Sequence, residues 1–500
     1  MTRKVTINRL TTGVPGFDEV LGGGIPEFSF NLIAGQSGSG KTTLAHQMMF
    51  AMATPERSAL YFTVLGEPAL KMLRYQQQFA YFRPEAVNSA IRFVNLADDA
   101  LGVDLDRVME RITAEVKTHN PALVFLDSFR SMVQASAADN PLMNNQQQFV
   151  KRLGITMASW QATTFLLGGY ADELDAGPVT TVADGLIWLR QSVQRNSMVR
   201  KMEIVKMRGQ PTLAGLHTFR INGAGIEIFP PATFALAGTR GTIASSEQRV
   251  AMGTPHLDDM LGGGLPTGYS VLVAGPSGSG KSIMARAFLE EGARRGETGV
   301  IAAFEQHPNR SCNPAFMALI NSGQVSLVDG RMPDLSIEEI LQLVVKDIKR
   351  LNATRVVIDS LSGFELTVAP TFRADFRESL SRLVIALAGT GVSMLMTSEL
   401  EDRYTDLRFS PYGTAFLTDA IIVQRYIEIE SRLRRVMAVV KVRASMHSNQ
   451  LREYTIDDAG IRIGDMLSEE QGLLVGMPRH KGSGESAAAP AAASSLGAGR

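Results

Sequence analysis

Residues 13–43 read GVPGFDEVLGGGIPEFSFNLIAGQSGSGKTT, and residues 253–283 read GTPHLDDMLGGGLPTGYSVLVAGPSGSGKSI. The two stretches align without a gap, so that Lys41 recurs as Lys281, 240 residues later. Each contains Gly-x-x-x-x-Gly-Lys followed by Thr or Ser, which is the phosphate-binding P-loop pattern. Because the pattern occurs twice at the same place in a long internal repeat, it indicates a duplicated domain.

The sequence around each P-loop has the context that phosphate binding requires. A short apolar run, residues 30–34 or 271–274, precedes the glycines, and a helix-compatible segment, residues 42–53 or 282–293, follows them. A strand, a tight glycine turn and a helix N-terminus place backbone N–H groups and the positive end of a helix dipole around one anion. The predicted nucleotide-binding residues are Gly35, Ser37, Gly38, Ser39, Gly40, Lys41, Thr42 and Thr43 in the first copy, and Gly275, Ser277, Gly278, Ser279, Gly280, Lys281, Ser282 and Ile283 in the second.

Within a P-loop the lysine and the following hydroxyl have separate roles. Lys41 and Lys281 are expected to reach the β- and γ-phosphates, while Thr42 and Ser282 hold Mg²⁺ through their hydroxyls. The expected cofactors are therefore ATP and Mg²⁺. The alternative, a flexible Gly/Ser turn with no ligand, is disfavoured by two complete copies in equivalent contexts.

The duplication sets the domain organisation of the 500 residues. We expect a first domain at residues 1–234, a linker rich in Ala, Gly, Ser and Thr at 235–248, and a second domain at 249–466. Residues 467–500 form a tail that is predicted to be disordered from about residue 479, where the sequence becomes rich in Gly, Ser, Ala and Pro.

Composition narrows the class of protein. Lys plus Arg and Asp plus Glu both number 50, and this balance argues against a nucleic-acid-binding protein. No apolar run reaches the length of a bilayer span, so no membrane association is expected. The N-terminus, MTRKVTINRL, lacks the apolar core of a signal peptide, which predicts a cytoplasmic protein. Cys312 is the single cysteine, which rules out an internal disulfide and favours a buried or idle thiol.

Acidic residues follow the second predicted strand of each half. Residues 59–64 lead into Leu65, Gly66 and Glu67, and residues 300–304 lead into Glu305. In P-loop folds whose second strand lies beside the first, a carboxylate at this point can polarise the attacking water. Glu305 and Glu67 are therefore the candidate catalytic bases. The alternative for both is a solvated loop acid.

A buried strand in each half ends in Asp-Ser. The first reads ALVFLDS, ending at Asp127 and Ser128, and the second reads RVVIDSLS, with Asp359 and Ser360. An aspartate after an unbroken apolar strand fits the Walker B position, which holds Mg²⁺ directly or through water. The alternative is an aspartate that caps the next segment.

The rest of each half alternates predicted strands and helices and closes with a hairpin-like pair, HTFRINGAGIEIFP or REYTIDDAGIRIG. This order predicts an α/β fold in which each domain is a mostly parallel, doubly wound sheet with a C-terminal antiparallel ribbon.

Two cation pairs stand on predicted strands near the end of each half. Lys206 with Arg208, and Lys441 with Arg443, alternate along their strands, so each pair projects to one side. In a ring of subunits such a pair could reach the γ-phosphate that a neighbour holds, as arginine fingers do. The alternative is a solvated edge strand decorated with basic residues.

The ordered set of motifs resembles the KaiC family of circadian clock ATPases, within the wider RecA-like group. The resemblance covers about residues 10–465 and rests on the tandem P-loops, the GGG-x-P run before each, Asp-Ser after Walker B and the KMRG-type strand. It implies two tandem RecA-like domains, a double-ring homohexamer with ATP bound between subunits, slow ATP hydrolysis in the first ring, and autokinase and reverse chemistry on Ser and Thr in the second. Clock or signalling proteins are the implied partners.

The resemblance also implies roles for individual residues. Glu305 matches the family's second-ring base, and we place it with Thr42 and Ser282 in the metal set; the residue after it is Gln306. The nucleotide contacts made from across a subunit interface correspond to Arg200, Lys206, Met207 and Arg208 in the first half, and to Arg435, Lys441, Val442, Arg443 and Ser445 in the second.

Departures from the family pattern leave several functions open. Leu65 and Gly66 replace the paired glutamates of the first half, so hydrolysis there depends on Glu67. Ala415 and Phe416 replace the Ser-Thr phosphoacceptors of the second half, which leaves Thr414 and Thr418 as candidates.

Four hypotheses follow from these motifs. The leading one is a KaiC-like, ring-forming ATPase that acts as a signalling or clock-type switch. The others are a non-hydrolysing nucleotide scaffold in the first domain, a serine/threonine autokinase in the second, and a DNA-handling motor of the RecA type. The charge balance and the absence of a basic, aromatic stretch disfavour the motor.

Overall fold

The computed structural model describes residues 7–63, 69–96, 105–128, 143–170, 177–194, 197–231, 248–304, 314–331, 334–368, 370–373, 376–400, 417–429, 431–466, 470–471 and 479–480. The chain divides into two compact units, residues 1–234 and 235–500. Of the predicted linker, only Gln248 is among the described residues. The described residues of the tail form β23 (Glu470–Gln471) and β24 (Arg479–His480), which pair antiparallel.

The described strands of the first unit are β1 (Arg9–Leu10), β2 (Ile25–Pro26), β3 (Phe30–Gly35), β4 (Ala59–Thr63), β5 (Ile91–Asn95), β6 (Leu123–Asp127), β7 (Thr163–Gly169), β8 (Gly185–Gln194), β9 (Ser197–Met207), β10 (Leu216–Asn222) and β11 (Gly225–Phe229). Its helices are α1 (Phe17–Leu21), α2 (Lys41–Met52), α3 (Ala69–Gln76), the 3₁₀ turn η1 (Pro84–Ala86), α5 (Leu105–His119), α7 (Met143–Ser159) and α8 (Gly177–Val182).

The described strands of the second unit are β12 (Arg249–Val250), β13 (Leu265–Pro266), β14 (Ser270–Gly275), β15 (Gly299–Ala303), β16 (Val325–Asp329), β17 (Arg355–Asp359), β18 (Ser393–Glu399), β19 (Ala420–Ile429), β20 (Arg432–Val442), β21 (Arg452–Asp457) and β22 (Gly460–Met466). Its helices are α9 (Leu257–Met260), α10 (Lys281–Arg294), α11 (Pro314–Asn321), α12 (Ile337–Leu351), α13 (Leu361–Thr367), α14 (Pro370–Arg373) and α15 (Phe376–Ala388).

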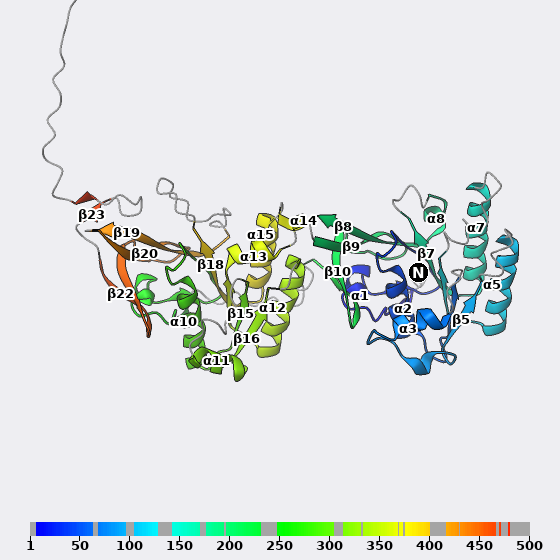
Figure 1. The fold of residues 1–500 in the computed structure, drawn as a ribbon, viewed down its shortest axis with the longest axis horizontal. Helices are drawn as coiled ribbons and strands as arrows, with labels where there is room; N and C mark the ends of the chain where they lie inside the picture. The colour runs from blue at the N-terminus through cyan, green and yellow to red at the C-terminus, as the bar shows by residue number, and fades with distance from the viewer. Residues whose placement is uncertain are drawn as a thin grey trace, which may run out of the picture. The chain divides into compact units, whose positions relative to one another are not determined.

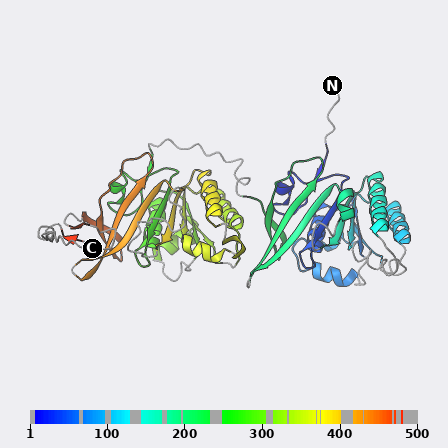
Figure 2. The same cartoon turned by 90° about the horizontal axis from the view of Figure 1, so that it is seen from above.

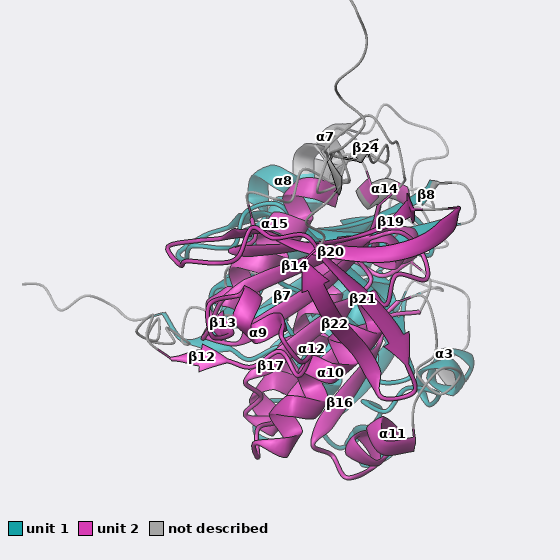
Figure 3. Cartoon of the chain, turned by 90° about the vertical axis from the view of Figure 1, so that its left-hand side faces the viewer, with its two compact units in different colours: residues 1–234 teal, residues 235–500 magenta. Residues whose placement is uncertain are grey.

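The main sheet has the same strand order in both units. In the first unit the nine described strands run β11-β10-β9-β8-β3-β7-β6-β4-β5, and in the second β22-β21-β20-β19-β14-β18-β17-β15-β16. The strands from β8 to β5 pair in parallel, whereas β8, β9, β10 and β11 pair antiparallel. The predicted fold class, a mostly parallel α/β sheet with an antiparallel ribbon, is therefore confirmed. In Figure 3 the ribbon strands β20, β21 and β22 lie next to one another in the magenta second unit.

Helices cover both faces of each parallel sheet, which explains the unbroken apolar strands. In the first unit α2 packs on one face together with Ile33 of β3, and α5 and α7 pack on the other together with Leu32. Neighbouring residues of β3 thus serve opposite layers, as the two-residue period of a strand requires. Figures 1 and 2 both show α5 and α7 side by side. The second unit repeats these layers with α10 on one face and the packed pair α12 and α15 on the other.

The strand order corrects one premise of the catalytic-base argument. We expected the strand that follows the P-loop helix to lie beside the P-loop strand, but β7 and β6 separate β4 from β3. In the second unit β18 and β17 separate β15 from β14 in the same way. The carboxyl end of β4 instead lies beside the end of β6, where Thr63 is the register partner of Asp127.

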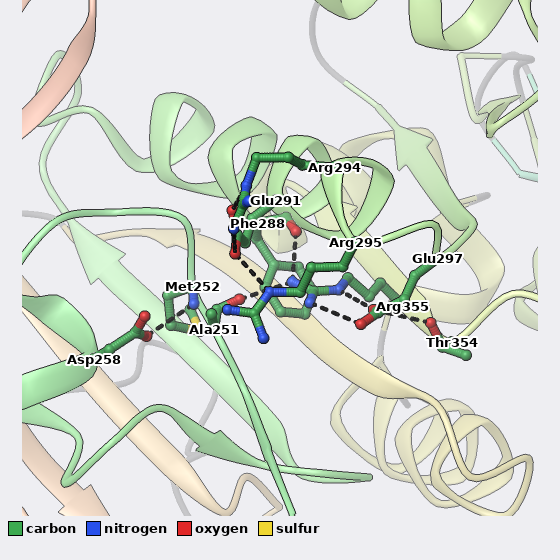
Figure 4. A network of polar contacts seen from close by, with 10 residues as sticks. All are labelled: Ala251, Met252, Asp258, Phe288, Glu291, Arg294, Arg295, Glu297, Thr354 and Arg355. Atoms are coloured by element: carbon green, nitrogen blue, oxygen red, sulfur yellow. Dashed lines mark hydrogen bonds and ion pairs between the residues drawn. The ribbon is translucent and has the colours of Figure 1, made fainter.

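A buried arginine ties the second unit together near the end of α10 (Figure 4). Arg355, which is 1% exposed, donates to Glu297 Oε2 at 2.6 Å and to the carbonyls of Ala251 and Phe288 at 2.8 and 2.7 Å. The Phe288 ring centroid lies 4.7 Å from the guanidinium. The first unit has the apolar Leu123 at the matching register position, so this network belongs to the second unit.

Candidate nucleotide-binding sites

The P-loops follow the carboxyl ends of β3 and β14 and lead directly into α2 and α10. Gly38 and Gly40 have φ angles of 77° and 105°, in the left-handed region that favours glycine. A Cβ on Gly40 would lie 2.9 Å from Ile221 Cδ1, whereas one on Gly38 would meet nothing within 4 Å. Glycine is therefore favoured at residue 40 mainly by the backbone conformation, because the contact is with the flexible end of Ile221. At Gly38 the φ angle alone favours glycine, because an added Cβ would lie in open space.

The P-loop lysines lie over their own loops. Lys41 Nζ donates to the carbonyls of Gly35 and Gln36 at 2.9 and 2.8 Å, and Lys281 Nζ donates to the carbonyls of Gly275 and Pro276 at 2.8 and 2.7 Å. Burial lowers the pKa of Lys41, and the nearby carboxylate of Asp127 opposes that shift. Each ammonium group thus lies at the mouth of the loop where a triphosphate would need a cation.

In the first site the Walker B carboxylate and the P-loop hydroxyl meet directly. Thr42 Oγ1 donates to Asp127 Oδ2 at 2.8 Å, and the buried Tyr61 hydroxyl donates to the same oxygen at 2.7 Å. Burial raises the pKa of Asp127, while the hydrogen bonds from Tyr61 and Thr42 and the charge of Lys41 lower it. Both of these hydrogen bonds use Oδ2 of Asp127. A P-loop hydroxyl beside a carboxylate is the donor set that Mg²⁺ takes in nucleotide sites.

The second site orients its Walker B residues through different neighbours. Asp359 accepts a hydrogen bond from Thr397 Oγ1 of β18, and Ile301 has the place that Tyr61 has in the first site. Ser360 Oγ accepts from the Gly363 N–H at 3.1 Å and caps α13. The cap of α13 is therefore Ser360, and not Asp359 as the capping alternative proposed. Both Asp-Ser peptide bonds, Asp127-Ser128 and Asp359-Ser360, are cis.

The two P-loops also differ in how their central serines are held. Ser279 Oγ donates to Gln424 Oε1 at 3.0 Å, and its carbonyl accepts from the Tyr454 hydroxyl at 2.6 Å. Ser39 is fully buried, and its hydroxyl has no hydrogen-bond partner among the residues that the structure describes. A polar atom buried beside an anion-binding loop is consistent with a ligand that would satisfy it.

The first cation pair lies at the far end of its sheet from its own P-loop. Arg208 Nη1 lies 3.0 Å from Asp184 Oδ1, and Lys206 Nζ donates to the carbonyls of Thr180 and Ala183 at 3.3 and 2.6 Å. The other oxygen of Asp184 accepts from the N–H of Phe30, which begins β3. The P-loop follows the opposite end of that strand.

The second cation pair repeats this geometry. Arg443 Nη1 lies 3.3 Å from Asp419 Oδ1, Lys441 Nζ donates to the Thr418 carbonyl at 2.7 Å, and Asp419 Oδ2 accepts from Ser270 at the start of β14. Burial and the neighbouring arginine lower the pKa of both lysines. The edge-strand alternative agrees with the local pairing, because β10 pairs with β9 only at residues 200–203 and β21 pairs with β20 only at residues 435–437, so among the described strands Lys206 and Lys441 have a partner strand on one side.

The remaining residues that were predicted to contact nucleotide from a neighbour do not all gather with these cations. Arg200 is the register partner of Gln191, whose side chain donates to the Ser37 carbonyl at 3.3 Å, so Arg200 lies at the P-loop end of its own sheet. Arg435 lies over the Tyr426 ring, 5.5 Å from its centroid, at the corresponding end. Met207 and Val442 are buried beside the cations. Ser445 Oγ accepts from Arg249 at 2.7 Å.

Several predicted residues lie outside the described ranges. They include the candidate bases Glu67 and Glu305 with their neighbours Leu65, Gly66 and Gln306, the segment with Thr414, Ala415 and Phe416, and Cys312. Thr418 is described and is fully buried, and its hydroxyl has no partner among the described residues. In this conformation Thr418 is therefore closed to phosphate transfer, which argues against it as a phosphoacceptor.

The donor set of the first site fits Mg·ATP. Among the described residues no group of three or more His, Cys, Asp or Glu side chains forms a ready-made metal site. A P-loop needs none, because one hydroxyl, the phosphate oxygens and water complete the magnesium shell. Sequence reasoning missed Tyr61, because a tyrosine in an apolar strand reads as a core residue. No helix in the described part of the chain has the length and apolarity to cross a membrane.

Fold and site together define a protein with two tandem RecA-like domains, each built around a nucleotide-binding P-loop. The sequence model of the family described as ATPase, KaiC matches residues 10–233 and 250–468. The chain therefore belongs to the KaiC family of ATPases, as the motifs predicted.

Similar proteins agree with this assignment. The chain is 27% identical over 489 residues to the "Circadian clock oscillator protein KaiC" of Picosynechococcus sp., covering 94% of this chain and 92% of that protein. It is 26% identical over 496 residues to the protein of the same name from Prochlorococcus marinus, covering 96% of each. It is also 26% identical over 490 residues to "Circadian clock oscillator protein KaiC 1" of Synechocystis sp., covering 94% and 92%.

Proposed function

We propose that this protein is a ring-forming ATPase in which each nucleotide is bound by the P-loop of one copy and completed by the cation pair of the next. Lys206 and Arg208 would complete the first site, and Lys441 and Arg443 the second. Subunit-shared ATP would make assembly depend on nucleotide, which is the basis of a conformational switch.

The observation that carries the proposal is the distance between each cation pair and its own P-loop. Met207 pairs with Gly185, which pairs with Asn31, four residues before Gly35 at the end of β3. Four residues of strand span about 13 Å, and β9 lies two strands from β3, about 10 Å across the sheet. The cations therefore cannot serve the nucleotide of their own copy. Under the proposal they would instead serve the nucleotide of a copy whose P-loop faces this end of the sheet.

The residues in each site divide the chemistry. Lys41 and Lys281 would bind the β- and γ-phosphates. Thr42 and Ser282 would bind Mg²⁺ through their hydroxyls, and the Walker B residues Asp127 and Asp359 would hold it directly or through water. When bound, Mg²⁺ supplies charge neutralisation at the phosphates. Glu305 is the proposed base of the second site. The first site depends on Glu67, because Leu65 and Gly66 supply no carboxylate.

The ATPase would act as a timing or signalling switch, as the names of its relatives suggest. A homohexamer with signalling or clock proteins as partners is the form we propose. The buried Thr418 does not favour autokinase activity at that residue.

Solution size with and without Mg·ATP tests the proposal. We expect analytical ultracentrifugation to show small species without nucleotide and hexamers with it. The variant that carries Lys41→Ala and Lys281→Ala should lose both ATP binding and assembly. A chain of one size under all conditions, or one that hydrolyses ATP as a monomer, would contradict the proposal.

A further inference from the structure

The triple-glycine run before each P-loop is a motif that nucleotide binding does not explain. Gly22, Gly23 and Gly24 have φ angles of 77°, 120° and 111°, and their counterparts at residues 262–264 have angles of 76°, 107° and 109°. The Gly23 N–H donates to the Asp18 carbonyl at 2.7 Å, and the Gly263 N–H donates to the Asp258 carbonyl at the same distance. Both runs therefore form the same left-handed bend, which we call the glycine bend.

The loop that follows the cation pair packs directly on this bend. A Cβ on Gly22 would lie 2.2 Å from the Pro211 carbonyl oxygen, and a Cβ on Gly262 would lie 2.5 Å from the Met446 carbonyl oxygen. Pro211 and Met446 are each three residues beyond the arginine of the cation pair. Only a hydrogen atom fits between bend and loop in either unit.

The same two carbonyls of each bend bind side chains that connect it to the cation loop. In the first unit Gln210 Nε2 donates to the carbonyls of Leu21 and Gly24 at 2.6 and 2.8 Å. In the second unit Arg249 Nη1 donates to the matching carbonyls of Leu261 and Gly264 at 3.1 and 2.8 Å.

In the second unit the side chain that connects the bend to the cation loop comes from a different segment. Its donor, Arg249, comes from β12 rather than from the cation loop, and it also donates through Nη2 to Ser445 Oγ, the counterpart of Gln210, at 2.7 Å. Arg9 of β1, the counterpart of Arg249, also donates through Nη1 to the bend of its unit, at the Gly22 carbonyl. The units thus share this arginine, and they differ in whether Gln210 or Arg249 connects the bend to the cation loop.

A backbone hydrogen bond completes the connection in both units. The Leu213 N–H donates to the Val20 carbonyl at 2.9 Å, and the Ser448 N–H donates to the Met260 carbonyl at 2.8 Å. These residues occupy matching positions in the two repeats. The connection between glycine bend and cation loop is therefore present in both units.

We propose that the glycine bends are positioning elements that hold the cation loops, residues 208–213 and 443–448, so that Lys206 with Arg208 and Lys441 with Arg443 point at the nucleotide of the neighbouring copy. The inference rests on the proposed function, since it needs these cations to act on a nucleotide. In this inference Gln210, Arg249 and the glycines affect catalysis only by positioning the cation pair.

Gly262→Ala in the full chain tests the inference, with Gly296→Ala as its matched control. Both glycines have φ near 80°, so both substitutions strain the backbone, but a Cβ on Gly296 would meet nothing within 4 Å. Second-site turnover is measured in a chain that carries Lys41→Ala. We expect Gly262→Ala to lower kcat by about 10²-fold, as misplaced catalytic groups do, with KM little changed. Gly296→Ala should leave kcat unchanged.

A double-mutant cycle separates positioning from loss of folding. Arg249→Ala, which removes the side-chain connection without a steric clash, should lower kcat and raise the ATP concentration needed for half-maximal assembly. Both effects should disappear in an Arg443→Ala background, because the group being positioned is then absent.

Each outcome of the cycle has one meaning. If Gly262→Ala and Arg249→Ala lower kcat equally with and without Arg443, the bend is merely structural and the inference is wrong. If neither changes kcat while Arg443→Ala does, the inference fails and the proposed function stands. If Arg443→Ala itself has no effect, the proposed function fails.

Discussion

Arg443→Ala separates the catalytic role of the second cation pair from its role in stability. Arg443 is 50% exposed at its side chain and forms an ion pair with Asp419 Oδ1 at 3.3 Å. The other oxygen of Asp419 keeps its hydrogen bonds from the Ser270 N–H and Oγ, at 2.9 and 2.8 Å. Because the pair is solvated and the carboxylate stays bonded, we expect the free energy of unfolding to fall by less than about 1 kcal/mol.

The expected effect on turnover is far larger. An arginine that reaches the transferring phosphoryl group contributes about 10³- to 10⁵-fold to kcat, which corresponds to about 4–7 kcal/mol of transition-state stabilisation. Loss of that contribution cannot be explained by a stability change of less than about 1 kcal/mol. The two measurements therefore distinguish a catalytic residue from a surface ion pair.

The assay pairs ATP turnover at saturating Mg·ATP with chemical denaturation of the same samples. Arg350→Ala is the matched control, because Arg350 is 54% exposed and pairs with Asp347 at 2.9 Å on the surface of α12. We expect both variants to fold alike and only Arg443→Ala to lose turnover. A kcat within about twofold of the unmodified protein for Arg443→Ala would refute the reasoning.

Three further predictions concern single residues. Burial raises the pKa of Asp127 above its value in the unfolded chain, so folding becomes less favourable as pH rises from the unfolded pKa through the folded one. Asp127→Asn removes this charge and should therefore raise the melting temperature of the nucleotide-free protein at neutral pH, measured in EDTA. An unchanged or lower melting temperature would contradict this prediction. Arg355→Ala should lower the free energy of unfolding by about 3–5 kcal/mol in urea denaturation, because it empties a buried site and leaves two carbonyls unpaired, and a loss below about 1 kcal/mol would argue against the network. Glu305→Gln should abolish most single-turnover hydrolysis in the second site while ATP still binds, and full turnover would remove Glu305 as the base.

The sequence predicted much of the fold because its strongest signals are local. The P-loop glycines, the apolar strands and the helix at residues 337–351 depend on near neighbours, and the structure has them at or within a few residues of the expected positions. The order of strands depends on long-range pairing. It could not be derived from adjacency in the chain, which is why β4 was expected beside β3.

The parts of the sites that the sequence did not predict depend on contacts between distant segments. Tyr61 acts on Asp127 across two neighbouring strands, and Gln210 bonds to Leu21 and Gly24 almost 190 residues away. The sequence did contain a signal for the contact that Gln210 makes. The glycine run recurs in both halves, although phosphate binding does not require it. Asp18, which recurs with the glycines, holds the bend through its carbonyl.

A mixing experiment tests the central claim most directly. One chain carries Lys41→Ala and Lys281→Ala, so its P-loops cannot bind nucleotide, and the other carries Arg208→Ala and Arg443→Ala, so it cannot complete a neighbour's site. If sites are shared between copies, each variant alone is inactive, and a mixture regains turnover wherever an intact P-loop meets an intact cation pair. Turnover in the mixture equal to the sum of the separate variants would show that each copy works alone, and would contradict the account.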